Sequence, residues 1–485
     1  MNPLAGRRRT PLAAVALALL SLAGLASPVA AQPGDRSPGV PPPVDLAALP
    51  TPDSVNAMPY TVNNPATQQT GPVQRWATCQ QQVTGSLRDL DDEPAAQQRL
   101  RIREAQRSAT GRGQLVAVID SGVQPHPRLS GGRLIDGGDY IEGRGGLFDC
   151  DGHGTAVAGL IAAAPDRATG FVGVAPGAGI LSIRQASTFY SVPLRQLKDG
   201  QEIHPSAGDT VSMARAVVRA VGRGATVINI SEAACFPAES NQVKASDLQA
   251  AVRYAVDHNV VVVVAAANVS DTCKQNSPGV VTTISSPGWF DEDVLTVAAT
   301  DEDGAPADFS MHGPWVDVAA PGTGAVSLAD GQPGLTGGLV DAHGVAHALD
   351  GTSFATPYVA GLVALVRERF TTLSARQVMH RIKQTARHPA DPGGRNDEIG
   401  YGLIDPVAAL TTALPEEHST QAQPTQTEPA HNQLLSPARL VAPRSLPPED
   451  TLPRTVALAG SAAALGLLGV TLLVVQIVKR QRQPQ

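Results

Sequence analysis

The sequence predicts an α/β protein with three layers, in which helices cover both faces of a mostly parallel central sheet, plus one transmembrane helix near the C-terminus. Between residues 111 and 412, short β-branched runs alternate with helical ones. The β-branched runs are apolar at nearly every position, which is typical of parallel strands buried on both faces. The transmembrane helix is predicted over residues 455–478, an apolar run without a charge.

Residues 1–31 have the three parts of a secretory signal peptide. Arg7, Arg8 and Arg9 precede a short apolar run, and Val29 and Ala31 are the small residues of a cleavage site. The alternative is an uncleaved N-terminal anchor, although the apolar run is short for a membrane span. In both cases the rest of the chain is exported.

Residues 32–110 are predicted to extend the main domain rather than to form a domain of their own. This extension begins with a proline-dense stretch and carries Cys79. It contains one predicted helix, over residues 94–108.

Residues 111–412 are predicted to form the main domain. The expected strands cover residues 115–120, 179–184, 225–231, 260–268 and 293–300. The expected helices cover residues 153–164, 210–224, 245–259, 352–370 and 374–386.

The C-terminal part is predicted to tether this domain to a membrane. Residues 413–454 are rich in Pro, Gln, Thr and Glu, which is typical of a disordered linker, with an end-to-end distance on the order of 35 Å. After the span at 455–478, residues 479–485 form a basic tail that belongs in the cytoplasm. We expect a single-pass protein of the cell membrane, held in the lipid bilayer, with its main domain outside the cytoplasm.

The charge of the chain argues against a nucleic-acid partner, because the net charge is −7 and no long basic run occurs. Four cysteines suit an oxidising location and allow three disulfide pairings: Cys79, Cys150, Cys235 and Cys273.

A zinc site is the competing interpretation of the cysteines, but neither C-x-x-C nor H-E-x-x-H spacing occurs. His343 and His347 have the spacing of a helical metal pair, yet Gly344 and the expected loop argue against one. No metal and no cofactor is predicted.

Four polar residues stand at the ends of predicted elements, where a parallel sheet gathers its functional groups. They are Asp120, His153, Asn268 and Ser353. Each alone fits a plainer role: a turn residue, a surface histidine, a strand-end cap and a helix cap. Together they supply a carboxylate, a base, an amide donor and a nucleophile, which is the set for acyl transfer.

The flanking sequences favour the catalytic interpretation, because the set resembles the subtilisin-like serine proteases. The matching stretches are "VAVIDSGV", "HGTAVAG", "VINIS", "AAAN", "DFSMHGPWVDVAAPG" and "GTSFATPYVAG", between about residues 114 and 410. The resemblance implies a subtilisin-like fold and a triad in which Ser353 attacks, His153 transfers the proton and Asp120 orients the imidazole. It also implies an oxyanion hole from the Asn268 amide and the Ser353 backbone N–H.

A narrower resemblance covers almost the whole chain. The signal peptide, the extension with one cysteine, "ISEAACFPA", the proline-rich linker and the C-terminal span together resemble the mycosins, the membrane-anchored subtilases of type VII secretion systems. This implies a serine endopeptidase that cleaves specific exported proteins and also stabilises the secretion membrane complex. It implies too that the extension wraps the catalytic domain.

The resemblance also assigns a substrate-lining strand and the disulfides. In the run Ser231, Glu232 and Ala233, small or apolar residues are usual after the serine, so we expect Glu232 to narrow the cleft or favour a basic side chain. The alternative is that Glu232 points to solvent. The family's sheet makes Cys235–Cys273 a plausible bridge, which leaves Cys79 to hold the extension through Cys150.

Three functions are compatible with this sequence. The first is an exported endopeptidase that processes specific proteins, and the second is a mainly structural component of a secretion complex with dispensable proteolysis. A degradative surface protease is the weakest, because the tether and Glu232 indicate a narrower task. For catalysis, activity is expected to rise through the reference histidine pKa of about 6.5.

Overall fold

The computed structural model describes residues 39–64, 69–79, 92–192, 197–198, 201–202, 204–239, 245–330 and 334–418. The predicted signal peptide, the transmembrane helix over 455–478, the basic tail and all but residues 413–418 of the predicted linker lie outside these ranges. Within the ranges, no helix combines the length and the apolar character needed to cross a bilayer.

A central sheet of seven strands forms the middle layer, and every neighbouring pair of strands is parallel. In spatial order the strands are β15 (Val318–Pro321), β14 (Leu295–Thr300), β12 (Val261–Ala265), β10 (Val227–Ile230), β4 (Leu115–Asp120), β6 (Gly179–Arg184) and β5 (Leu134–Asp139). The α/β class and the parallel sheet predicted from the sequence are confirmed.

The two edge strands β5 and β15 were not predicted. β5 reads "LIDGGD", and glycines weaken any strand signal. The structure explains Gly137, because a β-carbon there would lie 2.5 Å from the Ile183 side chain of the neighbouring strand β6. β15 reads "VAAP" and is only four residues long, which is too short for an alternating pattern.

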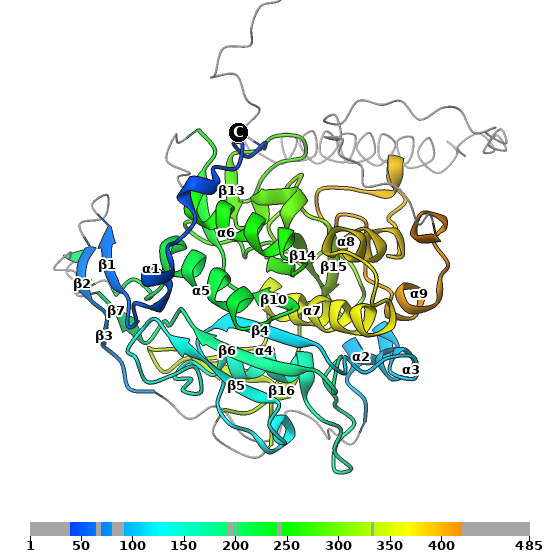
Figure 1. Ribbon diagram of the computed structural model, residues 1–485, viewed down its shortest axis with the longest axis horizontal. Coiled ribbons are helices and arrows are strands. Elements are labelled where there is room, and N and C mark those ends of the chain that lie inside the picture. Colours follow the sequence, from blue (N-terminus) through cyan, green and yellow to red (C-terminus); the bar gives the residue numbers. More distant parts are fainter. Residues whose placement is uncertain are drawn as a thin grey trace, which may run out of the picture. The chain divides into compact units, whose positions relative to one another are not determined.

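Helices cover both faces of the sheet (Figure 1). α4 (His153–Ala162) and α7 (Thr352–Arg369) pack against each other, and α5 (Thr210–Gly222) pairs with α6 (Ser246–Asp257). α8 (Ala375–Gln384) and α9 (Pro406–Thr411) complete the domain beside α7. Both faces of the strands are therefore buried, and α7 lies almost wholly in the core.

Short antiparallel pairs and turns lie outside the central sheet. Hairpins are formed by β8 (Leu197–Lys198) with β9 (Gln201–Glu202), β16 (Ser327–Leu328) with β17 (Leu335–Thr336) and β18 (Gly338–Val340) with β19 (Ala346–Ala348). β11 (Ala234–Pro237) pairs with β13 (Thr283–Ser286), which is distant in sequence. Four 3₁₀ turns are η2 (Pro127–Leu129), η3 (Gly288–Asp293), η4 (Pro392–Gly394) and η5 (Pro415–His418). His343 and His347 lie on the β18–β19 hairpin, not on a helix.

The first part of the extension lies along the main domain. It contains η1 (Leu46–Ala48), α1 (Pro52–Asn56), the hairpin β1 (Thr61–Asn64) and β2 (Gln69–Pro72), and β3 (Gln74–Arg75), which pairs with β7 (Tyr190–Ser191). The Tyr140 hydroxyl donates to the Val55 carbonyl at 2.6 Å, and the Tyr60 hydroxyl donates to Asp209 at 3.0 Å. Buried polar contacts therefore join the extension to the domain.

The helix predicted over 94–108 is broken into α2 (Ala95–Leu100) and α3 (Ile102–Ala105). Arg101 between them has φ +55°, which ends the first helix in a left-handed residue. Leu100 and Ile102 are both fully buried. In one continuous helix residues two apart point to different sides, so the break lets both side chains enter the core.

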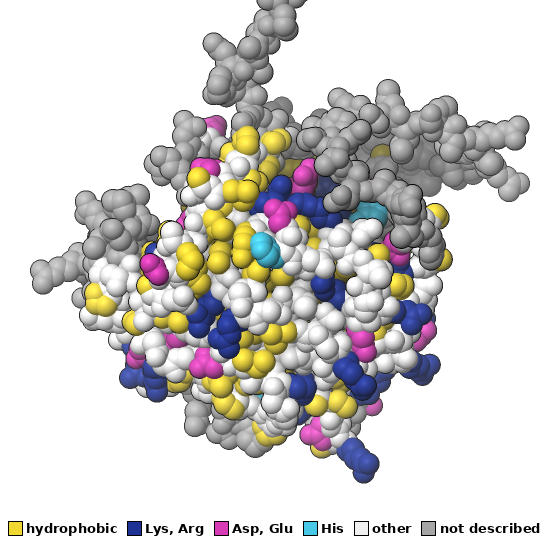
Figure 2. All heavy atoms as spheres, viewed as in Figure 1, with side chains coloured by type: hydrophobic (Ala, Val, Ile, Leu, Met, Phe, Trp, Pro, Cys, Tyr) yellow, Lys and Arg dark blue, Asp and Glu magenta, His cyan; other side chains and the backbone are white. Residues whose placement is uncertain are grey.

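Charges of both signs are interspersed over the face drawn in Figure 2, with hydrophobic side chains between them.

Candidate active site

The carboxyl ends of the neighbouring strands β4, β10 and β12 lie side by side. Beside β4 the order of strands changes direction, because β5 and β6 lie on one side of it and β10 and β12 on the other. Ile230 of β10 lies opposite Ile119 of β4 and Val264 of β12. The polar residues Asp120, Ser231 and Asn268 follow at the carboxyl ends of these strands. A parallel sheet binds its ligand at such a switch point.

His153 and Asp120 form a hydrogen-bonded pair at this edge. Nδ1 of His153 lies 2.7 Å from Oδ1 of Asp120, and the Asp120 side chain is fully buried while that of His153 is 18% exposed. A carboxylate at this distance keeps the proton on Nδ1, which leaves Nε2 as the acceptor. The sequence identified both residues.

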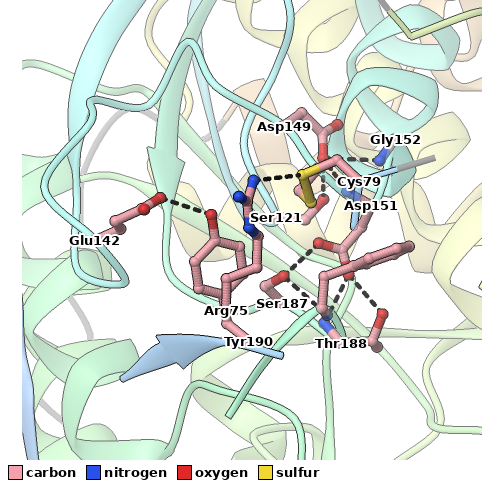
Figure 3. The surroundings of a disulfide bond; sticks show 12 residues. Arg75, Cys79, Ser121, Glu142, Asp149, Asp151, Gly152, Ser187, Thr188 and Tyr190 are labelled. Carbon is pink, nitrogen blue, oxygen red and sulfur yellow. Dashed lines mark hydrogen bonds between the residues drawn. A yellow bond between two sulfur atoms is a disulfide. The ribbon is translucent and has the colours of Figure 1, made fainter. Parts of the chain in front are cut away.

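A second carboxylate, which the sequence reasoning missed, fixes the start of α4. Asp149 accepts hydrogen bonds from the Ser121 hydroxyl at 2.9 Å, from the Gly152 N–H at 2.8 Å and from both the N–H and the hydroxyl of Thr155. Ser121 in turn accepts the N–H of Gly154 at 2.9 Å. Figure 3 shows Asp149 reaching toward Ser121 and Gly152. Acidic side chains at a helix N-terminus are stabilising, so the "DCDGHGT" run held a usable signal.

Ser353 is the second residue of α7, and the N-cap position of that helix is held by Gly351. Ser353 therefore does not occupy the capping position that the plainer interpretation gave it. The ring of Phe354, the next residue, lies 5.1 Å from the His153 ring, which brings the start of α7 to the His153–Asp120 pair.

Pro357 leaves the backbone carbonyl of Ser353 without its helical hydrogen bond. A proline has no N–H, so the Ser353 carbonyl has no helical partner four residues on. The hydroxyl of Ser231 donates to that carbonyl instead, at 2.9 Å, and accepts from Asn229 at 2.9 Å. β10 is thereby fastened to the helix that carries Ser353, and the Ser231 side chain is engaged in this contact.

The amide of Asn268 is oriented by α7. Its Oδ1 accepts hydrogen bonds from the Thr352 N–H at 2.9 Å and from the Thr352 hydroxyl at 3.0 Å. With its oxygen held, the amide presents Nδ2 to the cleft. Ala267, just before it, has φ +82°, a strained conformation for a residue with a β-carbon and one that clusters at active sites.

Gly351 marks the point that Ser353 and Asn268 share. A β-carbon on Gly351 would lie 2.9 Å from Oγ of Ser353 and 3.2 Å from Nδ2 of Asn268. These are close to the distances at which an oxyanion hole and a nucleophile hold a reacting carbonyl. Glycine keeps this space open.

The cleft at this edge contains all three residues predicted to contact a substrate, Ser231, Glu232 and Ala233. Its walls also include His153, Asn268 and Ser353, together with residues of the β18–β19 hairpin and of the segment 186–189. Glu232 lines the cleft and is only partly exposed, so it does not simply point to solvent.

The charge of the site raises the pKa of His153. Burial by itself lowers this pKa, but the charge of Asp120, its hydrogen bond and the charge of Glu232 outweigh burial. Burial, with the neighbouring Asp151 and Asp120 charges, raises the pKa of Asp149 to about 6. Several carboxylates therefore surround the His153 imidazole.

Two disulfides flank the cleft. Cys79 is bonded to Cys150, and Cys235 to Cys273, which is the pairing that the resemblance implied. Figure 3 shows Cys79 of the extension beside Asp149 and Asp151, whose carboxylate accepts hydrogen bonds from Ser187 and Thr188. The extension is thus fastened at Cys150, three residues before His153, the first residue of α4.

Among the described residues, one group has the donor set of a metal site: Asp120, His153 and Glu232, whose ligand atoms lie within 4.8 Å of one another. Two of these atoms already share a hydrogen bond at 2.7 Å. We derive no metal chemistry from this group.

Comparison with known proteins identifies the family. A model of the subtilase family matches residues 111–402. The chain is 42% identical over 410 residues to mycosin-3 of Mycobacterium tuberculosis, covering 80% of this chain and 84% of the relative. The chain is a mycosin of the subtilase family. As a mycosin it is a serine endopeptidase with the subtilisin-like fold.

Other mycosins agree along most of the chain. Mycosin-1 of Mycolicibacterium smegmatis is 40% identical over 412 residues, covering 81% of this chain and 86% of the relative. The crystal structure of MycP1 from Mycobacterium smegmatis is 39% identical, with a TM-score of 0.69, and covers 80% of this chain and 99% of that one. The resemblance found in the sequence is confirmed.

Proposed function

We propose that Ser353, His153 and Asp120 form the catalytic triad of this mycosin, with Asn268 in its oxyanion hole. The observation that carries the proposal is the shared point beside Gly351, reached by both the Ser353 hydroxyl and the Asn268 amide. His153 takes the Ser353 proton on Nε2 and passes it to the leaving amine, while Asp120 holds Nδ1–H and stabilises the imidazolium. Asn268 Nδ2 and the Ser353 N–H stabilise the charge on the carbonyl oxygen.

The substrates are specific proteins exported by a type VII secretion system, and residues 455–478 anchor the enzyme in the cell membrane. Two observations support this setting. The apolar C-terminal run is followed by a basic tail. In addition, a chain of the intact ESX-5 inner membrane complex is 37% identical, with a TM-score of 0.68, and covers 90% of this chain and 99% of that one.

A structural role in the secretion complex is the second candidate. It is favoured by the same likeness, together with the structure of the periplasmic assembly from the ESX-5 inner membrane complex, whose matching chain is 37% identical at a TM-score of 0.67. The two roles are compatible in one protein.

Profiling of protein N-termini in membrane and secreted fractions separates the roles. The wild type is compared with a deletion strain and with Ser353→Ala. We expect specific N-termini to vanish in both mutants. Unchanged N-termini in Ser353→Ala would contradict the catalytic assignment. If export fails in the deletion strain and survives in Ser353→Ala, the structural role is the one that export requires.

A further inference from the structure

Glu232 places a second carboxylate against the His153–Asp120 pair. One carboxylate oxygen of Glu232, one ring nitrogen of His153 and one oxygen of Asp120 lie within 4.8 Å of one another. Glu232 follows Ser231, whose hydroxyl is bonded to the Ser353 carbonyl, so its backbone is fixed relative to the nucleophile. Its side chain lines the substrate cleft.

The charged groups facing Glu232 include more carboxylates than cations. They are His153 from the start of α4, Asp120 from the end of β4 and Asp151 from the loop before α4; His153 also faces Asp149. Among the described residues, no lysine or arginine forms an ion pair with Glu232 or with Asp120. In the free enzyme, the imidazole is therefore the cation that Glu232 meets.

This arrangement of carboxylates favours the protonated form of His153, in which it cannot act as a base. Both carboxylates raise the pKa of His153, while burial raises the pKa of Glu232. An imidazole beside two carboxylates retains its proton to higher pH, and a protonated His153 cannot accept the proton of Ser353. A cation that pairs with the Glu232 carboxylate from the cleft lowers the pKa of His153 again, because it offsets the negative charge of Glu232.

We propose that Glu232 selects substrates with a lysine or arginine side chain at the position beside the His153 ring, and that this cation, by pairing with Glu232, frees His153 to act as the base. The inference rests on the triad proposed above and adds a substrate class to it. No new bond is made in the step: the imidazolium loses its proton to water as the substrate cation replaces it beside Glu232. Substrates that carry the cation thus complete the catalytic site as they bind.

The test uses the full-length protein in detergent and internally quenched peptides with one varied position at a time. A fluorophosphonate probe, which reacts with the activated serine and carries no peptide side chain, counts active enzyme in each variant. For the wild type we expect kcat/KM at one position to favour lysine or arginine over norleucine by about tenfold or more. Glu232→Gln should abolish this preference while probe labelling persists.

The pH dependence of kcat tests the coupling separately, because kcat reports the enzyme–substrate complex. In the wild type, kcat for the cationic peptide should rise at lower pH than kcat for its norleucine analogue. In Glu232→Gln the two profiles should coincide, and the rise of kcat/KM should move to lower pH. A role of Glu232 in folding alone moves neither profile.

Two further variants keep the test decisive. Glu239→Gln removes one charge from the exposed end of the same segment and should behave as the wild type. Glu232→Asp keeps the charge on a shorter side chain and should keep part of the preference. A cation preference that survives in Glu232→Gln overturns the inference. Loss of probe labelling in Ser353→Ala together with normal peptide hydrolysis would instead overturn the triad.

Discussion

Single residues at the cleft act through partners that hold their reactive atoms in place. Asn268 is the clearest case, because Thr352 occupies its amide oxygen from two sides. The amide nitrogen is then free for a carbonyl oxygen and needs no reorganisation during the reaction, which is what makes such donors effective.

Asn268→Ala should therefore lower kcat by about 10²–10³-fold, a loss of about 2.7–4 kcal/mol of transition-state stabilisation, and leave KM nearly unchanged. Peptide hydrolysis by active-site-titrated enzyme measures this. A proportionate rise in KM with unchanged kcat would mean that the amide binds the ground state instead.

The pH dependence of hydrolysis is determined by one residue, His153. Only neutral His153 accepts a proton, and the surrounding carboxylates raise its pKa despite burial. Activity is thus lost as pH falls through the raised pKa, so the rise of kcat/KM should lie above the reference value of about 6.5 that the sequence alone predicts. Rates measured from pH 5 to 10 with a neutral peptide test this, and a rise at or below the reference value contradicts it.

At the scale of elements, the start of α7 shows how a helix can present a nucleophile. Gly351 leaves open the space between the hydroxyl and the amide, and Pro357 frees a carbonyl that β10 then holds through Ser231. A motif of small residues followed by proline is thus explained by two contacts distant in sequence.

Gly351→Ala should reduce kcat by at least about 100-fold, because its methyl group would occupy the space between the Ser353 hydroxyl and the Asn268 amide, where we propose that the scissile carbonyl sits. Gly222→Ala is the matched control, since a β-carbon at that position, the last of α5, meets nothing within 4 Å. Activity is compared per folded enzyme, because the new β-carbon of Gly351→Ala meets the Ser353 hydroxyl at 2.9 Å and should also lower the thermal unfolding temperature. Equal activity of the two would refute the assignment of this space to the substrate.

The disulfides also act between elements, by joining segments 71 and 38 residues apart. Replacing Cys79 and Cys150 by serine should lower the free energy of unfolding by about 2–5 kcal/mol. The Cys235–Cys273 bridge closes a shorter loop, so its replacement by two serines should lower the free energy of unfolding by about 0.5 kcal/mol less on the loop-entropy account. Denaturant unfolding of both double variants makes the comparison. The reverse order would show that local packing outweighs loop length.

At the scale of the whole molecule, residues of the main domain line the cleft, and the proposed anchor at 455–478 lies beyond this domain in sequence. A chain ending at residue 418 should therefore hydrolyse peptides with the kcat of the full chain. Cell fractionation should place the full chain in the membrane pellet and the shortened chain outside it. A shortened chain that still pellets would contradict anchoring by residues 455–478.

The sequence by itself determined the fold class, the family and the four residues around which the proposed site is built. It could do so because each is recorded in short stretches of sequence. Strands are apolar at nearly every position, helices repeat apolar residues with a fixed period, and short motifs stand at the ends of both. The weak edge strands β5 and β15 escaped prediction because neighbours across the sheet, rather than local propensity, hold them in place.

Only the tertiary structure decided how those residues are held and what surrounds them. The roles of Asp149, Thr352 and Gly351 lie in hydrogen bonds and close approaches across the fold, which their short motifs do not specify. The same holds for Glu232, whose chemistry depends on lying within 4.8 Å of a histidine and an aspartate from other elements. Charge and distance act through space, and folding alone brings these groups together.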